Sequence, residues 1–386
     1  MTGLFLSLLV LLSPDLTLAP LNASEPLRAR PLPIDLLDNP PPRPRVEPID
    51  AAPPSPSPTP TPAEDARFTA GLEAARAVAG AYGITFAVVR DGRVEWSGVS
   101  GRARDGTSRL QPDQPFVIGS VTKTYVAATI LQLEEENRLD LDDRLSEHLP
   151  KLRAFGRTAT LRQLLDHTSG FADVFNDTTR RGLEDHPELP WTEEQILGSV
   201  HAPWYEPGDG WAYANTNYYL LGLVVEQVTG RSLADEVATR FLEPLGLRQT
   251  RLLGGADDEE AGLLPPAWAT IFWASGAMSA SAADLARWGD ALYAGDVLSS
   301  RSLEAMERLN SHDYGLGVQK VELPGVTGFG HTGLLNTYTT LLVYLPDADA
   351  TLALLVNRSN VDLGGMLAAK PPGGGPSLLE LVEAKP

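Results

Sequence analysis

The chain contains no cysteine in 386 residues. Disulfides, thiolate catalysis and cysteine-based metal sites are therefore excluded together, whereas the redox compartment stays open because a cysteine-free chain tolerates any. The six histidines are scattered along the sequence and no His-Glu-x-x-His pattern occurs, so we expect neither a metal site nor another cofactor.

Basic residues are also scarce. The chain has 31 lysines and arginines against 50 aspartates and glutamates, which gives a formal net charge of −19. Such a chain repels phosphate backbones, and no cluster of lysine and arginine falls on a predicted helix face. We therefore expect no nucleic-acid partner.

Long hydrophobic runs are missing as well. The apolar run from Leu4 to Leu12 is too short to span a bilayer comfortably, but it fits the hydrophobic region of a signal peptide. No lysine or arginine precedes it. Residues 1–23 are therefore expected to be a signal peptide, cleaved after Ala23, with an uncleaved anchor or a misassigned start as the alternatives. We expect an exported protein of the periplasm, the extracellular space or the cell envelope.

Proline, by contrast, is abundant, with 13 prolines between Pro31 and Pro62. Because proline lacks an N–H and fixes φ, this stretch favours an extended spacer over helix or strand. We expect three parts: residues 1–23, a proline-rich linker at 24–65 and a globular domain at 66–386. The composition of the linker favours a tether near a cell wall or membrane over a ligand for an SH3-like domain.

The globular part combines strands at both ends with helices between them. Residues 68–83 have apolar positions at helical spacing and predict a helix that ends at Gly83. Residues 84–103 predict two strands joined by Asp91-Gly92, and residues 339–359 predict two more around a Pro-Asp turn. The expected class is α+β, with an antiparallel sheet formed from both chain ends, flanked by helices and interrupted by a mostly helical inserted subdomain.

The segment FVIGSVTKTYVAAT, residues 116–129, places a serine and a lysine in surroundings typical of burial. A helix that begins at Ser120 would bring Lys123 onto the same face one turn later. The ordinary interpretation is a helix-start serine and a lysine that extends to water. However, an unpaired buried ammonium costs several kcal/mol, and a desolvated lysine with a lowered pKa can act as a base toward a hydroxyl.

Two further patterns follow. Tyr213-Ala214-Asn215 lies in a loop rich in proline and glycine that leads into a predicted helix, and His331-Thr332-Gly333 stands at the start of a strand-like run. Taken alone, each pattern is better explained by a structural role: a packed aromatic and a turn asparagine in the first, and a structural strand histidine in the second. Gly333 would nonetheless let a substrate backbone come close.

In this order, Ser-x-x-Lys, Tyr-x-Asn and His-Thr-Gly resemble the motifs of the serine β-lactamase and D,D-peptidase superfamily. The similarity covers roughly residues 67–360 and is strongest toward class C β-lactamase-related proteins, D-alanyl-D-alanine carboxypeptidases and their esterase relatives. The sequence segments 161–171, 207–222 and 274–288 also resemble sequences of that family. An α/β-hydrolase is not supported, because the sequence has no Gly-x-Ser-x-Gly motif to carry the nucleophile of that fold.

The resemblance implies that Ser120 is the nucleophile of an acyl-enzyme. Either neutral Lys123 takes the serine proton, or cationic Lys123 stabilises a tyrosinate at Tyr213 that takes it. Asn215 would hold both the substrate amide and Lys123. The backbone N–H groups of Ser120 and Leu334 would form the oxyanion hole.

The third motif carries His331 where many β-lactamases have lysine. The resemblance implies that a histidine at this position is more typical of D,D-peptidases and esterases. His331 and Thr332 would bind a substrate carboxylate, and the charge of His331 is conditional near neutral pH. His167, in the phrase at 161–171, is expected to be structural.

We therefore expect a serine hydrolase that acts on a small peptide, ester or β-lactam. D,D-carboxypeptidase-like cleavage of a cell-wall peptide is the first choice, with carboxylesterase or β-lactamase activity as alternatives. A catalytically silent penicillin-binding sensor is the alternative that is not an enzyme.

Overall fold

The computed structural model describes residues 60–152, 158–254 and 262–384. The expected signal peptide or anchor at 1–23 lies outside the described residues, as does nearly all of the expected linker at 24–65. The last linker positions belong to a helix that begins at Pro62, where Thr61 caps it by accepting a hydrogen bond from the Glu64 N–H.

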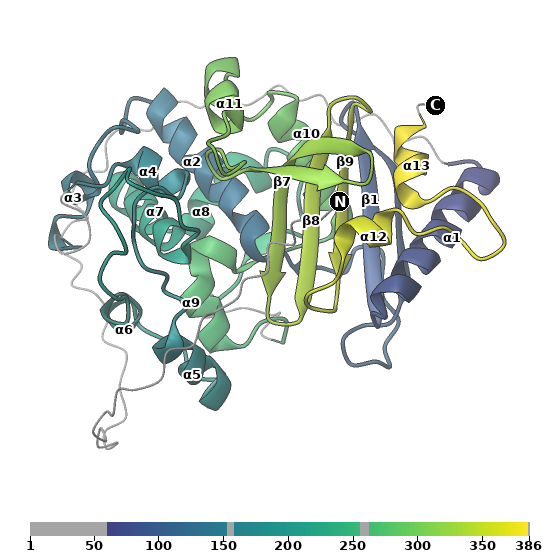
Figure 1. The fold of residues 1–386 in the computed structure, drawn as a ribbon, viewed down its shortest axis with the longest axis horizontal. Helices are drawn as coiled ribbons and strands as arrows, with labels where there is room; N and C mark the ends of the chain where they lie inside the picture. Colours follow the sequence, from purple (N-terminus) through teal and green to yellow (C-terminus); the bar gives the residue numbers. More distant parts are fainter. Residues whose placement is uncertain (1–59, 153–157, 255–261, 385–386) are drawn as a thin grey trace. The chain divides into compact units, whose positions relative to one another are not determined.

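The central feature is a six-stranded sheet with the order β2-β1-β9-β8-β7-β6, in which all neighbours are antiparallel. Its strands are β1 (Gly83–Arg90), β2 (Arg93–Gly101), β6 (Gln319–Leu323), β7 (Val326–Leu335), β8 (Tyr338–Leu345) and β9 (Ala350–Val356). β1 pairs with β9, so the two ends of the domain meet in the middle of the sheet. The predicted fold class is confirmed (Figure 1).

The hairpin between β1 and β2 turns at Asp91 and Gly92, whose φ angles are 47° and 73°. Two consecutive residues with positive φ are what a tight turn needs if it is to match the twist of the strands that it joins. The predicted hairpin is therefore confirmed.

The helices are α1 (Pro62–Ala79), α2 (Thr122–Glu135), α3 (Leu145–His148), α4 (Leu161–Leu165), α5 (Asp177–Asp185), α6 (Glu193–Gly198), α7 (Asn215–Thr229), α8 (Leu233–Val237), α9 (Pro266–Gly276), α10 (Ala282–Tyr293), α11 (Ser300–Glu307), α12 (Leu363–Leu367) and α13 (Leu378–Glu383). Two segments form single 3-10 turns, η1 (Gly119–Val121) and η2 (Pro150–Leu152), and η3 (Ala238–Leu242) is a π-helix. The prediction that the first helix ends at Gly83 is wrong: it ends at Ala79, because Gly80 adopts the left-handed conformation with φ 57°.

Helices cover both faces of the sheet. On β1, Phe86 and Val88 point into one apolar cluster with residues of α1, α12 and α13, whereas Ala87 and Val89 point into a second cluster with α10 and the helical insert. This alternation follows from the two-residue period of a strand. The three sequence motifs lie on the side of the second cluster.

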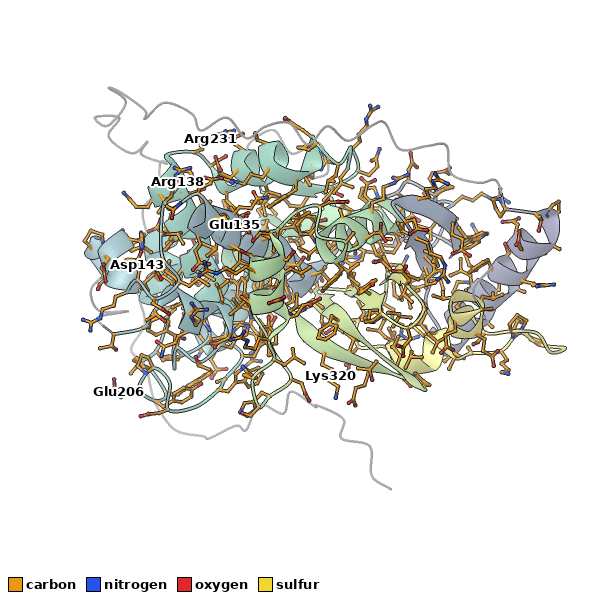
Figure 2. The ribbon with its side chains drawn as sticks, turned by 90° about the horizontal axis from the view of Figure 1, so that it is seen from above. Glu135, Arg138, Asp143, Glu206, Arg231 and Lys320 are labelled. Carbon is orange, nitrogen blue, oxygen red and sulfur yellow. The ribbon has the colours of Figure 1, made fainter. Side chains whose placement is uncertain are left out.

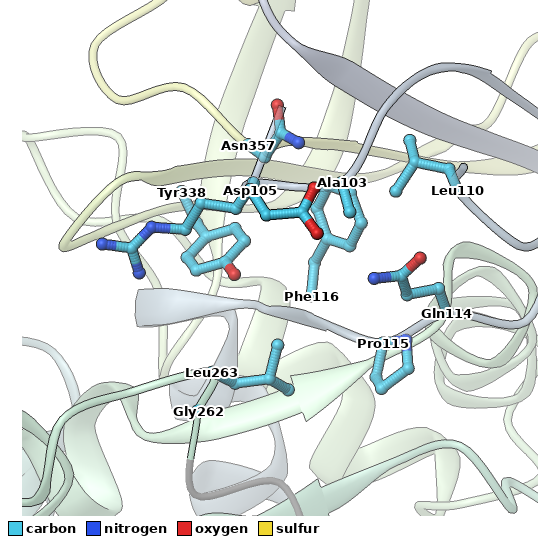
Figure 3. Close-up of a pocket in the computed structure, with 11 residues that line it drawn as sticks. Ala103, Asp105, Leu110, Gln114, Pro115, Phe116, Gly262, Leu263, Tyr338 and Asn357 are labelled. Carbon is cyan, nitrogen blue, oxygen red and sulfur yellow. The ribbon is translucent and has the colours of Figure 1, made fainter. Parts of the chain in front are cut away.

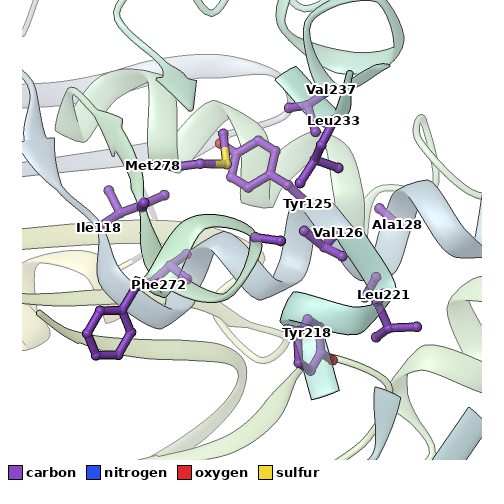
Figure 4. Close-up of a cluster of buried hydrophobic side chains, with 14 of the residues drawn as sticks. Ile118, Tyr125, Val126, Ala128, Tyr218, Leu221, Leu233, Val237, Phe272 and Met278 are labelled. Carbon is purple, nitrogen blue, oxygen red and sulfur yellow. The ribbon is translucent and has the colours of Figure 1, made fainter. Parts of the chain in front are cut away.

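The helical insert contains a second, small sheet of β3 (Phe116–Val117), β5 (Met278–Ala280) and β4 (Arg251–Leu252). At its centre α2 is enclosed almost entirely by apolar side chains of α7, α8, α9 and β5 (Figure 4). Every residue of α2 from Thr122 to Leu131 is buried. A polar side chain at the start of this helix must therefore find its partners inside the protein.

Charged side chains lie at the outside of the helical part, where Glu135 and Glu206 are exposed (Figure 2). Arg231 pairs with Glu236 at 3.3 Å. Among the described residues, no helix is both long enough and apolar enough to span a membrane.

Candidate active site

Ser120 lies in the short turn η1, and α2 begins only at Thr122, so the prediction of a helix that begins at Ser120 is wrong by two residues. The turn is tight because Gly119 adopts a φ of 54°, which an L side chain rarely adopts. Lys123 still returns toward the serine, and its Nζ lies 3.0 Å from Ser120 Oγ. The serine itself is half-buried.

Lys123 is fully buried and has three hydrogen-bond acceptors around its Nζ. Besides Ser120 Oγ, these are Asn215 Oδ1 at 2.9 Å and the backbone oxygen of Ser275 at 2.7 Å. Burial lowers the pKa of Lys123 to about 7, although the nearby charge of Asp173 opposes this. Neutral and charged forms are therefore both accessible near neutral pH.

Tyr213 stands in the loop before α7, and Lys123 Nζ lies 4.8 Å from the centroid of its ring. Its hydroxyl is buried without a hydrogen bond of normal geometry to any described residue. Burial raises the pKa of Tyr213, and the nearby Ser120 hydroxyl lowers it only in part. The site thus favours the neutral phenol over a tyrosinate.

Asn215 is the first residue of α7, and its side chain bridges two groups of opposite charge. Its Oδ1 accepts from Lys123, while its Nδ2 donates to Asp173 Oδ2 at 3.2 Å. Asp173 and Ser275 are not among the site residues predicted from the sequence. Ser275 lies in the family-like segment 274–288, and Asp173 follows closely on the segment 161–171. Neither residue type at that spacing indicates a partner of Lys123 on its own.

His331, Thr332 and Gly333 lie well inside β7, which begins at Val326, and not at the start of a strand as predicted. β7 packs directly against η1. A Cβ on Gly333 would lie 1.9 Å from the backbone oxygen of Ile118, and one on Gly119 would lie 2.8 Å from the backbone nitrogen of Leu334. Glycine is required at both places because no side chain fits between the two segments, and the backbones of Ser120 and Leu334 therefore come close together.

His331 is 1% exposed, and its Nε2 lies 2.9 Å from the hydroxyl of Tyr314. Burial, helped by the charge of Lys123, lowers the pKa of His331 to about 3. The imidazole is therefore neutral at physiological pH. Thr332 Oγ1 accepts a hydrogen bond from the Gln319 amide at 3.0 Å.

His167 packs beside the Tyr213 ring, with a centroid distance of 4.3 Å. Its Nδ1 accepts from the Ala214 N–H at 3.3 Å and lies 3.0 Å from Asn217 Nδ2. Burial keeps the pKa of His167 well below its ordinary value. These contacts hold the loop that carries Tyr213, which is a structural task.

A separate cavity of about 160 Å³ lies between the segment before β3, the start of β8 and the segment before α9 (Figure 3). Phe116, Tyr338 and Asn357 are among its lining residues, and none of the eight predicted site residues is. Within the described ranges, no group of three or more histidine and acidic side chains is arranged to hold a metal ion.

The geometry can be set beside known proteins. A family model described as Beta-lactamase matches residues 66–368, which is well over half of the chain. The chain belongs to this family. It is thus a member of the serine β-lactamase and D,D-peptidase superfamily, whose members are serine hydrolases that act by acyl transfer.

Two curated relatives are penicillin-binding proteins. The chain is 27% identical to Penicillin-binding protein 4* of Bacillus subtilis over 284 residues, which is 64% of this chain and 62% of that protein. It is 29% identical to Penicillin-binding protein 4 of Amycolatopsis lactamdurans over 299 residues, which is 67% of this chain and 76% of that protein. The chain thus spans less than two thirds of the first of these relatives.

Among solved structures, a D-stereospecific amidohydrolase from Streptomyces is 29% identical with a TM-score of 0.67. The match covers 82% of this chain and 98% of that one. A D-amino acid amidase from Ochrobactrum anthropi is 23% identical with a TM-score of 0.65, covers 76% of this chain and 92% of that one, and shows the fold alone.

Proposed function

We propose that the protein hydrolyses an amide or ester bond next to a D-amino acid in a small substrate, with Ser120 as nucleophile. The observation that carries this proposal is the 3.0 Å contact between Ser120 Oγ and the buried Nζ of Lys123. A serine hydroxyl is a weak nucleophile until a base removes its proton. A lysine whose pKa lies near 7 is suited to that task.

Neutral Lys123 is the acylation base in this proposal. It can donate two N–H groups to Asn215 Oδ1 and to the Ser275 carbonyl, which leaves its lone pair for the serine proton. Burial raises the pKa of Tyr213, and a tyrosinate would therefore be costly to form. This supports the first of the two alternatives that the sequence left open.

The reaction then has two halves. Ser120 Oγ forms a bond to the carbonyl carbon while its proton passes to Lys123 Nζ, and the N–H groups of Ser120 and Leu334 stabilise the negative oxygen. As the bond between the carbonyl carbon and the leaving amine or alcohol breaks, the Tyr213 hydroxyl donates its proton to the leaving group and takes up the proton held by Lys123 Nζ, so that both side chains return to their neutral forms. Water then cleaves the acyl-enzyme by the reverse order of proton transfers.

The third motif supports a substrate without a carboxylate at its scissile end. His331 is neutral, and Lys123, as the neutral base, directs its two N–H groups to Asn215 and Ser275 and its lone pair to Ser120, so neither side chain offers a free cation to a substrate carboxylate. The neutral Thr332 hydroxyl and Gln319 amide suit a neutral amide or ester group better. The 29% identical neighbour described as a D-stereospecific amidohydrolase supports the same class.

D,D-carboxypeptidase activity is the second candidate, favoured by the two relatives described as penicillin-binding proteins. It requires recognition of a terminal carboxylate, which would have to rest on neutral donors here. Carboxylesterase and β-lactamase activities share the same acylation step and differ in leaving group and in the speed of deacylation.

The test compares hydrolysis of D-phenylalanine amide, L-phenylalanine amide, an N-acylated D-Ala-D-Ala peptide, p-nitrophenyl acetate and benzylpenicillin, each with Ser120→Ala beside it. Faster turnover of the D-amide supports the proposal, and preference for the D-Ala-D-Ala peptide would move it to the second candidate. Mass spectrometry after benzylpenicillin separates slow deacylation, seen as a lasting adduct, from β-lactamase turnover. No turnover of any substrate would overturn the proposal in favour of a silent penicillin-binding sensor.

We further propose that the protein is exported and that its proline-rich segment tethers the domain near a cell wall or membrane. The apolar run at 4–12 and the 13 prolines between Pro31 and Pro62 support this. Fractionation of cells that express the full chain tests it, and recovery in the cytoplasm at full length would contradict it.

A further inference from the structure

We propose that Asp173 is a positioning residue that fixes the orientation of the Asn215 amide and thereby directs Lys123 toward Ser120. The inference rests on the proposed function, because it concerns the base in that reaction. No motif of the sequence analysis includes Asp173.

The Asp173 carboxylate is held by three donors. Its Oδ1 accepts from the backbone N–H groups of Asn215, at 3.0 Å, and of Phe175, at 3.1 Å. Its Oδ2 accepts from Asn215 Nδ2 at 3.2 Å. The carboxylate thus sits at the N-terminal end of the 15-residue helix α7, where the helix dipole favours a negative charge.

This arrangement removes the usual ambiguity of an asparagine side chain. An ionised carboxylate can only accept hydrogen bonds, so the Asn215 amide must turn its Nδ2 toward Asp173 and its Oδ1 toward Lys123. Asn215 Oδ1 can in turn only accept. The ionised Asp173 therefore fixes which atoms of the Asn215 amide donate and accept, and the amide passes this order on to Lys123.

The consequence for Lys123 is directional. Asn215 Oδ1 and the Ser275 carbonyl are both pure acceptors, so two of the four tetrahedral positions around Nζ are N–H groups in either protonation state. A third position points to Ser120 Oγ, as an N–H in the ammonium and as the lone pair in the amine. A flipped amide would present Nδ2 to Lys123 and pull the lone pair away from the serine.

The two charges also influence each other across the amide. Asp173 raises the pKa of Lys123 against the effect of burial, and Lys123 lowers the pKa of Asp173, which burial raises to about 6. The other titratable side chains near Lys123 are those of two histidines and two tyrosines, whose pKa shifts all favour the neutral form: His167, His331, Tyr213 and Tyr218. Asp173 is therefore the anionic partner of this lysine.

The test is an isosteric change that spares the backbone contacts. Asp173→Asn keeps an acceptor for the two backbone N–H groups but replaces Oδ2 with a donor, which then faces the donor of Asn215. We expect kcat to fall by about 10²-fold, the usual effect of a misplaced catalytic group, with little change in KM.

The double variant Asp173→Asn with Asn215→Asp restores the order of donors and acceptors with the charge moved one position. We expect it to recover at least about tenfold in kcat over Asp173→Asn. Because its carboxylate touches Lys123 directly, the acid limb of the kcat/KM profile should move up by about one pH unit or more. A role in folding alone predicts neither the recovery nor the shift.

Asp284→Asn is the matched control. This buried carboxylate accepts from the Gln249 N–H at 2.7 Å and contacts Arg287, and it has no contact with the catalytic motifs. It should cost stability without moving the acid limb. If Asp173→Asn does not fold, Asn215→Asp is compared with the double variant instead. In Asn215→Asp two carboxylates face each other, and the double variant replaces one of them with an amide.

The inference is overturned if Asp173→Asn keeps the wild-type kcat and acid limb, or if the double variant is no better than Asp173→Asn. Failure of the proposed function has a different signature. In that case wild type shows no turnover that depends on Ser120, whatever residue stands at position 173.

Discussion

The hydroxyl of Tyr314 lies 2.9 Å from Nε2 of His331, and this contact determines the form of the third motif. The other ring nitrogen, Nδ1, lies 2.5 Å from the backbone oxygen of Thr332, which can only accept. The proton of the neutral ring therefore sits on Nδ1, and Nε2 accepts from the tyrosine. His331, the first residue of the third motif, is therefore an uncharged element of the strand.

The first prediction concerns the titration of His331. Its folded pKa of about 3 lies below the ordinary value of 6.5, so the unfolded chain binds more protons between these values. Its contribution to stability is therefore complete above about pH 6.5 and is lost as the pH falls toward 3. We expect His331→Asn to reduce the loss of urea stability between pH 7 and pH 4.5, and an equal loss in both proteins would contradict the assignment.

Lys123 should set the acid limb of activity. Its pKa of about 7 means that the neutral amine dominates above that pH, so kcat/KM should rise with pH through about 7 and then level off. The pH profile on a non-ionising ester measures this directly. A profile that stays flat down to pH 5 would exclude neutral Lys123 as the base.

Removal of the nucleophile should abolish covalent chemistry. Ser120→Ala should lower kcat by about 10⁶-fold, the scale found when a catalytic serine is removed from other hydrolases. It should also prevent adduct formation with benzylpenicillin in intact-protein mass spectra. A loss below tenfold would mean that Ser120 is not the nucleophile.

Two glycine variants distinguish the backbone strain at Gly119 from the contact that this residue makes with β7. Gly119→Ala would push a methyl group to 2.8 Å from the Leu334 nitrogen, whereas Gly92→Ala, also at positive φ, meets nothing within 4 Å. Both should lose about 1–2 kcal/mol from the left-handed backbone. Only Gly119→Ala should also lower kcat, and equal kcat values for the two variants would contradict the predicted oxyanion hole.

The helix that carries Lys123 is fixed to the sheet side through Trp288 on α10. Trp288 is fully buried, stacks on Tyr125 at 4.0 Å between ring centroids and donates to Thr124 Oγ1 at 2.8 Å. Trp288→Ala should lower the free energy of unfolding by about 3–5 kcal/mol in urea melts. The control Trp204→Ala, at a residue 55% exposed, should change it by less than about 0.5 kcal/mol.

Local patterns were sufficient for much of the fold. Asp91-Gly92 identified a hairpin because few residue pairs accept two positive φ angles. The apolar strands at the two chain ends predicted a sheet built from both, and β1 does pair with β9. The start of α2 was misplaced because the close packing of β7 on Gly119, which no local pattern encodes, demands a tight turn before the helix.

Residue types, their order and their short-range spacing were enough to predict the class of fold, the family and the motif residues. The chemical state of those residues depends on contacts that form only in the folded chain. Lys123 meets Asn215 and Ser275 across separations of 92 and 152 residues, and Asp173 reaches it through Asn215. A pKa or an amide orientation depends on burial and on such distant partners, and these exist only once the chain has folded.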